Sequence, residues 1–476
     1  MSSNFFVWEW NEMKEQISID AVMKSAKKLF FVGIGGISMS SLAFVCRRHG
    51  YEVSGSDRAY SAMTEKLENE GIPVIHEHRR DSVWGMDAVV YTGAVSLTSP
   101  ELAEATERGI PVIYRADLLG YMMKDYACRI GVAGMHGKST CTSMLAHLFM
   151  DAKRNPTVLS GAETEEMGGA YILGEGDHFI FEACEYKDSF LCFFPTVSVV
   201  LGIDLDHTDY FTEGLPQIKR SFLQYANLPF EKEEVLPFSV MCADDENVRD
   251  ILPEVKFAVT FGIRSADADY RAVNITEEKG RYAFDILKKG EYLTHISLSV
   301  VGYHHIYNAL ASAAVGDMLG LTAEEISSGL DSFAGLRRRF EYKGSINGAD
   351  VFIDYAHHPK EIGATLAGAG RMTKGKLICF FEPHTYSRTA SLFREFTEAF
   401  GDADEVYFLD IYAAREENVW GVSSEMLAAE THGGRYVSSY EEAARLIREI
   451  ASENDTFMIL GAGTVDRIAG ILFPCK

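Results

Sequence analysis

The sequence predicts an α/β protein of three domains in series, and three observations support this prediction. The regions 28–126 and 335–476 alternate short apolar strands with helix-like segments, as parallel βαβ units do. Between them, a glycine-rich turn at 130–140 leads from a strand into a helix and opens a second series of strands. The chain has 476 residues, which suffices for about three domains with separate cores. We therefore predict Rossmann-like domains over 1–126 and 335–476 and a mostly parallel central domain over 127–334.

The N-terminal region contains the first candidate ligand site. Its expected strands and helices alternate at 29–33, 38–49, 51–54, 61–70, 86–91 and 99–108. The first turn contains Gly33, Gly35, Gly36 and Ser38, and Asp57 follows the second strand. This arrangement is similar to a dinucleotide fingerprint, except that Ser38 replaces the last glycine. It favours a phosphate-bearing ligand, but the glycines could instead serve only close packing of helix against strand.

The turn after the strand at 128–133 is the most informative motif. It reads Gly134-Met135-His136-Gly137-Lys138-Ser139-Thr140 and precedes a helical pattern. Backbone N–H groups of such a turn converge on phosphate oxygens, a lysine can span the β- and γ-phosphates, and a hydroxyl can reach Mg²⁺. The common P-loop spacing would place a glycine where this chain has Val132, so a chance Gly-Lys-Ser sequence is the alternative.

Carboxylates follow two further strands of the central region. Glu182 and Glu185 end the strand expected at 178–183, and Asp204, Asp206, His207 and Asp209 follow the strand at 196–203. Hard oxygen ligands suit Mg²⁺, so these positions are candidates for a metal beside the phosphates. For Asp204 and Asp209, a solvated acidic loop is an equally good interpretation. A small β meander at 255–300 and a helix at 306–318 complete the region.

The last region is again α/β, and its expected strands lie at 350–355, 376–381, 405–411 and 456–461.

The net charge of the chain is −24, which argues against a nucleic-acid partner. None of the eight cysteines forms a C-x-x-C pair, so we expect free thiols and a cytoplasmic protein. The apolar stretch 29–46 contains three glycines and three serines, which argues against a membrane segment or a signal peptide.

Taken together, these motifs resemble those of the Mur ligase family over nearly the whole chain. Family G-T-H-G-K-T-T corresponds to 134–140, E-A-D-E-x-D-x-S-F to 182–190, and D-H-x-D to 206–209. Family G-x-H-N-x-x-N corresponds to 302–308, R-R-F to 338–340, D-Y-x-H-H-P-x-E-I to 354–362, and P-H-x-x-x-R to 383–388. The last two motifs are the most specific. The family turn also accounts for the spacing that departs from the common P-loop pattern.

The resemblance implies an ATP-dependent ligase that forms an amide bond. It is strongest to the members that add L-alanine to the lactyl carboxylate of UDP-N-acetylmuramate through an acyl phosphate, in the synthesis of peptidoglycan precursors. It implies a UDP-binding first domain, a central P-loop ATPase domain and a C-terminal domain that binds the amino acid. The expected partners are UDP-N-acetylmuramate, L-alanine and ATP with Mg²⁺, and the chain is expected to be a monomer or weak homodimer.

The resemblance also implies roles for individual residues. ATP would be bound by Gly134, His136, Gly137, Lys138, Ser139, Thr140, His304, Asn308, Arg339 and Asp354. The metal ligands would be Ser139, Glu182 and His207, and the UDP-sugar would contact Gly33, Gly35, Gly36, Ser38 and Asp57. The amino acid would be bound by Tyr355, His357, His358 and Arg388. Lys138, His207 and Arg388 would act in catalysis, with His207 as the candidate base for the amine.

Four positions depart from the family pattern, and three other functions are compatible with part of it. The departures are Cys184 in place of aspartate, His305 in place of asparagine, and Ser38 and Ser41 in place of the last two glycines of the family turn G-I-G-G-x-G-M-S-G, which corresponds to 33–41. The nearest alternative is a murein-peptide ligase that attaches a tripeptide to UDP-N-acetylmuramate. An NAD-dependent oxidoreductase would explain only the first turn, and a non-catalytic UDP-sugar sensor would leave Lys138 without a role.

Overall fold

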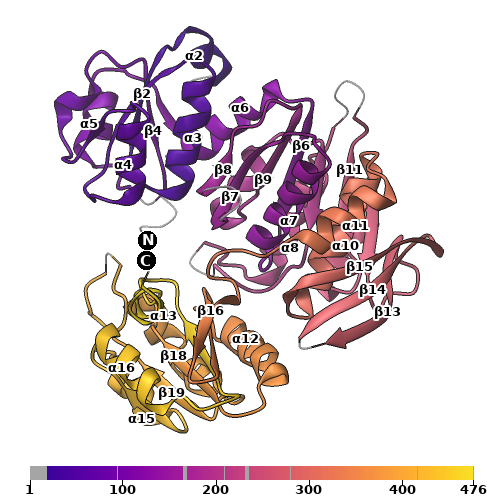
Figure 1. Ribbon diagram of the computed structural model, residues 1–476. Coiled ribbons are helices and arrows are strands. Elements are labelled where there is room, and N and C mark those ends of the chain that lie inside the picture. Colours follow the sequence, from indigo (N-terminus) through magenta and orange to yellow (C-terminus); the bar gives the residue numbers. More distant parts are fainter. Residues whose placement is uncertain are drawn as a thin grey trace. The chain divides into compact units, whose positions relative to one another are not determined.

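The computed structural model describes residues 19–93, 95–164, 169–207, 210–230, 235–278, 280–414 and 416–474. Asp209, one of the acidic candidates, lies outside these ranges. Figure 1 labels the helices and strands of these residues. The chain divides into two compact units. The first comprises Met1–Arg271, Leu287–Glu291 and Tyr307–Gly329, and the second comprises Ala272–Ile286, Tyr292–Ile306 and Leu330–Lys476.

The first unit begins with a parallel five-stranded sheet in the order β3-β2-β1-β4-β5. Its strands are β1 (Lys28–Val32), β2 (Glu52–Ser56), β3 (Val74–Ile75), β4 (Ala88–Tyr91) and β5 (Val112–Tyr114). Its helices are α2 (Ile19–Ser25), α3 (Ile37–Arg48), α4 (Ala62–Asn69), α5 (Pro100–Glu107) and α6 (Arg115–Met122), with short 3₁₀ helices η1 (Arg80–Val83) and η2 (Met123–Asp125). Strand order reverses between β1 and β4, and ligands of open α/β sheets bind at such a switch point.

A second sheet of the first unit is parallel in the order β12-β11-β10-β6-β9-β7, and β8 runs antiparallel to β7. The strands are β6 (Cys128–Ala133), β7 (Thr157–Thr164), β8 (Gly169–Ile172), β9 (His178–Glu182), β10 (Val197–Val200), β11 (Phe238–Cys242) and β12 (Ala258–Gly262). The helical segments are α7 (Lys138–Asp151), η3 (Tyr186–Cys192), α8 (Leu215–Ala226), α9 (Glu246–Ile251) and η4 (Leu252–Glu254). Sequence periodicity did not predict β7, β8 or β11, whose sequences show no regular alternation of apolar and polar residues.

The expected meander corresponds to β13 (Tyr270–Glu278), β14 (Arg281–Lys288) and β15 (Glu291–Val301), which are consecutive neighbours in their sheet. Two helices follow, α10 (His304–Met318) and α11 (Ala323–Ser332). Alternate residues of β14 and β15 are buried, including Tyr282, Phe284, Ile296 and Leu298. This period of two is the one that led us to expect strands in this region.

The second unit is built on a six-stranded sheet in the order β16-β17-β21-β18-β19-β20. Its elements are β16 (Glu341–Ile346), β17 (Ala349–Asp354), α12 (Pro359–Met372), β18 (Leu377–Phe381), α13 (Tyr386–Ser391), α14 (Phe393–Glu398), β19 (Glu405–Phe408), α15 (Ser424–Glu430), β20 (Gly434–Tyr436), α16 (Tyr440–Ile450), β21 (Thr456–Leu460) and α17 (Arg467–Leu472). Only β16 runs antiparallel to its neighbour. Asp354 and Phe381 both lie opposite Leu460, so the carboxyl ends of β17, β21 and β18 meet at one edge of the sheet.

Each face of this sheet has its own core. Val351, Ile353 and Phe380 pack on one face, and Phe352 and Phe381 pack on the other. Successive residues of a strand point to opposite faces, so strands covered by helices on both sides read as continuous apolar runs.

The cysteines in the described part of the chain are free thiols, and five of them are buried: Cys46, Cys128, Cys141, Cys242 and Cys379. None of the described helices combines the length and the apolar character needed to cross a membrane.

Candidate active site

The turn after β1 is stabilised by Asp57, the first residue after β2. The Gly35 N–H donates to Asp57 Oδ2 at 3.0 Å, and Gly33 has a positive φ of 79°. A Cβ on Gly35 would lie 2.9 Å from the same Asp57 oxygen, so only glycine fits this close approach. Ser38 is exposed in the first turn of α3. The structure therefore brings together the residues predicted to bind the UDP-sugar, and it gives Asp57 a contact within the protein.

Ser41, one of the departures from the family pattern, lies one helical turn further along α3. Its side chain is buried, and its hydroxyl donates to the Ile37 carbonyl at 2.7 Å, within α3. A serine in this position satisfies its own polar group and leaves the first turn of the helix unchanged.

The glycine-rich turn between β6 and α7 has the backbone of an anion site. Gly134 and Gly137 have positive φ values of 147° and 81°, and α7 begins at Lys138. The N–H groups of a first helical turn have no partner within the helix, and the helix dipole favours negative charge there. Asn308 in α10 is buried, and its Oδ1 lies 3.0 Å from the position that a Cβ on Gly137 would occupy. Asn308, predicted to contact ATP, therefore lies beside this turn.

Lys138 forms a charged cluster with Glu185 and His207. Its Nζ donates to Glu185 Oε1 at 3.0 Å and to the Gly134 carbonyl at 2.7 Å. His207 Nε2 lies 3.5 Å from the same Glu185 oxygen. The Glu185 side chain is only 2% exposed and that of Lys138 only 14%, so this charged pair is almost entirely removed from water.

Burial and neighbouring charges shift the pKa values of Lys138 and Glu185 in opposite directions. Burial lowers the pKa of Lys138, but the carboxylates of Glu185 and Glu182 outweigh it, and the net pKa is raised. Burial raises the pKa of Glu185, but the Lys138 charge and the His207 hydrogen bond outweigh it, and the net pKa is lowered. Lys138 and Glu185 are therefore held as an ion pair at neutral pH. The sequence analysis placed Glu185 with Glu182 as a candidate beside a metal, but it did not predict the ion pair with Lys138.

Ser139 and Glu182 form a second polar pair at the start of α7. The Ser139 hydroxyl donates to Glu182 Oε2 at 2.8 Å. These two oxygens are hard ligands that fit Mg²⁺, which is usually held by one or two carboxylates together with phosphates and water. Within the described ranges, no group of three or more His, Cys, Asp or Glu side chains forms a metal site. His207, predicted as the third ligand, contacts Glu185.

The remaining predicted residues of this turn differ in exposure. His136 is exposed, and Thr140 is 7% exposed.

Cys184 lies between Glu182 and Glu185 in the sequence, and burial together with the Glu185 charge raises its pKa to about 11. It is therefore a neutral thiol at physiological pH and a poor substitute for the carboxylate of the family pattern.

His304 and His305 begin α10 in the second unit. His304 is exposed, whereas His305 is buried, and their ring centroids are 4.1 Å apart. Burial, together with the His304 and Arg339 charges, lowers the pKa of His305 well below its ordinary value. His305 is therefore neutral, as is the asparagine that the family has at this position.

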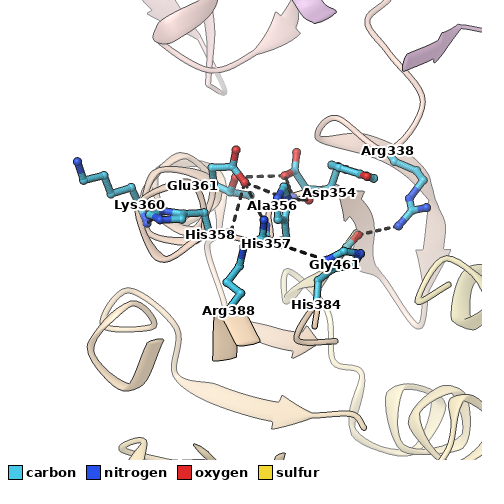
Figure 2. A network of polar contacts seen from close by, with 12 residues as sticks. Arg338, Asp354, Ala356, His357, His358, Lys360, Glu361, His384, Arg388 and Gly461 are labelled. Atoms are coloured by element: carbon cyan, nitrogen blue, oxygen red, sulfur yellow. Dashed lines mark hydrogen bonds and ion pairs between the residues drawn. The ribbon is translucent and has the colours of Figure 1, made fainter. Parts of the chain in front are cut away.

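The second site lies where β17 ends (Figure 2). Asp354 is buried and accepts the N–H groups of Phe340 at 2.7 Å and Ala356 at 2.8 Å. Burial raises its pKa, and the Arg339 charge offsets part of this effect. The Arg339 guanidinium lies 5.1 Å from the centroid of the Tyr355 ring. Arg339, in the segment before β16, thus lies beside Tyr355, which follows Asp354 at the end of β17.

Two of the predicted amino-acid ligands differ in what they contact. His357 Nδ1 lies 3.1 Å from the Tyr355 carbonyl and 3.3 Å from Glu361 Oε2. His358 is the N-cap of α12, and its Nδ1 accepts the Lys360 N–H at 3.3 Å. A capping side chain is committed to the helix terminus, which favours a structural role for His358.

Arg388 on α13 lies beside a histidine that sequence reasoning did not select. The Arg388 Nη1 is 3.1 Å from His384 Nδ1, and the His384 ring is 5.9 Å from that of His357 (Figure 2). Burial, with the Arg388 and His357 charges, lowers the pKa of His384 to about 4. The motif P-H-x-x-x-R at 383–388 could have indicated His384 from the sequence. Its histidine follows β18 and so lies at the same sheet edge as Asp354.

Three family models match successive parts of the chain. These are the Mur ligase family catalytic domain at 28–127, the Mur ligase middle domain at 132–316, and the Mur ligase glutamate ligase domain at 338–463. The chain belongs to the Mur ligase family. Mur ligases are ATP-dependent, and the matches cover both the phosphate turn and the residues around Asp354.

Individual Mur ligases match the chain over almost its whole length. The UDP-N-acetylmuramate--L-alanine ligase of Clostridium perfringens is 40% identical over 96% of this chain and 100% of its own. The solved structure of the UDP-N-acetylmuramate-alanine ligase of Thermotoga maritima superposes with a TM-score of 0.78 and 26% identity, over 94% of this chain and 98% of that chain. A murein peptide ligase of Psychrobacter arcticus shares the fold, with a TM-score of 0.66 and 21% identity over 94% and 98% of the two chains.

Proposed function

We propose that this protein joins L-alanine to the lactyl carboxylate of UDP-N-acetylmuramate while ATP is converted to ADP and phosphate. The observation that carries the proposal is the end-to-end likeness to the L-alanine ligase of Clostridium perfringens. The geometry supports it, because the chain combines an anion-binding turn with an arginine–histidine cluster suited to an amino acid.

In the proposed first step, the sugar carboxylate attacks the γ-phosphate of ATP and forms an acyl phosphate. Both reactants are anions, so the step requires positive charge at the phosphate. Lys138 supplies it, since Glu185 keeps the ammonium group charged and fixes its position 3.0 Å away. Mg²⁺ held by Ser139 and Glu182 would neutralise further phosphate charge. The glycines of the turn leave room for the phosphates against the backbone.

In the proposed second step, the nitrogen of alanine attacks the acyl phosphate and phosphate leaves. The carboxylate of alanine requires a cation with several donors, and the Arg388 guanidinium meets this requirement. The His384 ring orients Arg388 through the contact at 3.1 Å. Arg339 precedes β16 and Asp354 ends β17. We propose both residues on the ATP side.

Substituting Gly35 tests the proposed UDP-sugar site. In Gly35→Ala, the new methyl group would lie 2.9 Å from Asp57 Oδ2 and from Thr64 Cγ2, so the turn must shift. We expect affinity for UDP-N-acetylmuramate to fall roughly tenfold, corresponding to about 1.4 kcal/mol, with the KM for ATP unchanged. Calorimetric titration with the UDP-sugar measures this. Gly401→Ala is the control, because no atom lies within 4 Å of its Cβ and the residue has no predicted ligand contact.

Phosphate release measures the activity directly. The purified protein should release phosphate from ATP only when UDP-N-acetylmuramate and an amino acid are both present, with L-alanine preferred. The alternative is a murein-peptide ligase, which would respond to a tripeptide and not to alanine. That response would overturn the alanine assignment.

We also propose that the protein is a monomer or weak homodimer in the cytoplasm. Size-exclusion chromatography tests the oligomeric state, and cell fractionation tests the location.

A further inference from the structure

The His357–His384 pair supplies complementary hydrogen-bonding groups whose protonation follows from their neighbours. The two ring centroids are 5.9 Å apart and the ring planes are inclined by 65°. Both rings adjoin Arg388 in the cluster that Figure 2 shows. A neutral imidazole donates from one nitrogen and accepts at the other, and its contacts decide which is which.

His384 presents a donor. An arginine has five N–H groups and no acceptor, so the contact of Arg388 Nη1 at 3.1 Å requires the lone pair of His384 Nδ1. The ring is neutral at physiological pH, since its pKa is lowered to about 4 by burial and by the Arg388 and His357 charges. Its proton is therefore on Nε2. That N–H and the remaining guanidinium donors of Arg388 suit the carboxylate of an amino acid.

His357 has the opposite arrangement. Its Nδ1 lies near two acceptors, the Tyr355 carbonyl at 3.1 Å and Glu361 Oε2 at 3.3 Å, so Nδ1 carries the proton. The lone pair is then on Nε2, for which no hydrogen-bond partner is found within the described ranges. The backbone N–H of His357 also donates to Glu361, at 3.1 Å, which fixes the orientation of the residue.

Building on the proposed function, we infer that His357 Nε2 is the proton acceptor for the ammonium group of L-alanine. Alanine enters with a carboxylate and an ammonium group. Arg388 and His384 Nε2–H bind the carboxylate, and His357 Nε2 faces the ammonium. His207, the candidate from the sequence, is less suitable, because its Nε2 is already directed to Glu185.

The proton balance is complete without another reactant. The ammonium nitrogen gives one proton to His357 Nε2 and recovers its lone pair. This pair forms the C–N bond at the acyl carbon, the bond from that carbon to the phosphate oxygen breaks, and its electron pair leaves with phosphate. The second proton of the nitrogen leaves with the phosphate, and His357 returns its proton to water. One N–H remains in the amide.

Several charged groups set the proton affinity of His357. Burial lowers its pKa, Glu361 on α12 raises it, and Arg388 on α13 and Arg339 before β16 lower it, with a net decrease. The ring is therefore neutral at pH 7 and able to accept a proton. The same two guanidinium groups disfavour the ammonium form of bound alanine. They therefore bring the proton affinity of the alanine nitrogen closer to that of His357 Nε2.

The substitution His357→Gln tests this role. We expect kcat/KM for alanine to fall roughly 100-fold, since general-base catalysis typically contributes this much. In the wild type, kcat/KM for alanine should fall as the pH drops through the lowered pKa of His357. In the variant this acid limb should be absent, and the rate should rise with pH toward the pKa of the free amine.

An assay with hydroxylamine distinguishes the deprotonation of the amine from the earlier formation of the acyl phosphate. Its nitrogen is unprotonated at neutral pH, so it captures an acyl phosphate as a hydroxamate without needing a base. His357→Gln should form hydroxamate from ATP and UDP-N-acetylmuramate at the wild-type rate, and the exposed His432→Gln should match the wild type in both assays. If the Gln variant is unstable by thermal denaturation, His357→Asn, whose amide N–H can replace Nδ1–H, takes its place.

Three outcomes would contradict the proposal. Unchanged alanine kinetics and pH profile in the variant would exclude His357 as the base, while the proposed function would stand. Equal loss of hydroxamate formation would mean that His357 acts before the amine step. If the wild type itself forms hydroxamate but no product with alanine, the proposed function fails, and the base proposal fails with it.

Discussion

Replacing Lys138 with alanine is expected to abolish turnover, with a loss of about 10³-fold or more in kcat because a buried cation at a transferring phosphate is removed. The substitution also leaves Glu185, 2% exposed, without its cation. The carboxylate would then add repulsion to the phosphates that Lys138 now attracts. Steady-state phosphate release with UDP-N-acetylmuramate, alanine and ATP measures the loss. Binding of the UDP-sugar should be largely intact, since the turn after β1 does not contain this residue.

Two further variants distinguish the loss of the Lys138 charge from a loss of stability. Lys256→Ala removes an exposed lysine from the same unit and should leave kcat unchanged. Lys138→Ala/Glu185→Gln removes both partners of the ion pair, so it should recover stability lost by the single variant without recovering turnover. Substantial activity in Lys138→Ala would refute the assignment of this turn as the phosphate site.

Changing Asp354 to alanine is expected to destabilise the protein by about 3 kcal/mol and to abolish activity. The buried carboxylate accepts the N–H groups of Phe340 and Ala356 at 2.7 and 2.8 Å, and its removal leaves both donors without this acceptor. Phe340 also has a positive φ of 50°, a conformation that needs support from its surroundings. Urea denaturation measures the change in the free energy of unfolding, and hydrogen exchange at the two amides reports where the structure is loosened.

The control for this variant lies on the same strand. Asp350→Ala removes a half-buried carboxylate from β17 and should change the free energy of unfolding by no more than about 0.5 kcal/mol. If Asp354→Ala were equally mild, the carboxylate would not be what holds the loop. Retained activity in a stable Asp354→Ala protein would argue against a role on the ATP side.

Much of the fold was predictable because local patterns determine it. Apolar runs separated by helical periodicity located β6, β9, β10, β17, β18 and β21 within a few residues. Glycines before Lys138 indicated the anion site, since only particular backbone conformations allow such a turn. The short edge strands β3 and β20 lacked a comparable signal, because two or three residues show no period.

By itself, the sequence determined the α/β class, the phosphate turn at Lys138 and the family motifs. The tertiary structure decided which side chains meet. Glu185 follows β9 and His207 follows β10, and these strands flank β6, so both side chains reach the Lys138 turn. His384 reaches His357 because β18 and β17 both lie beside β21. Spacing along the chain places a residue at the end of a strand, but its partner depends on which strands are neighbours, and strand order is a property of the folded sheet alone.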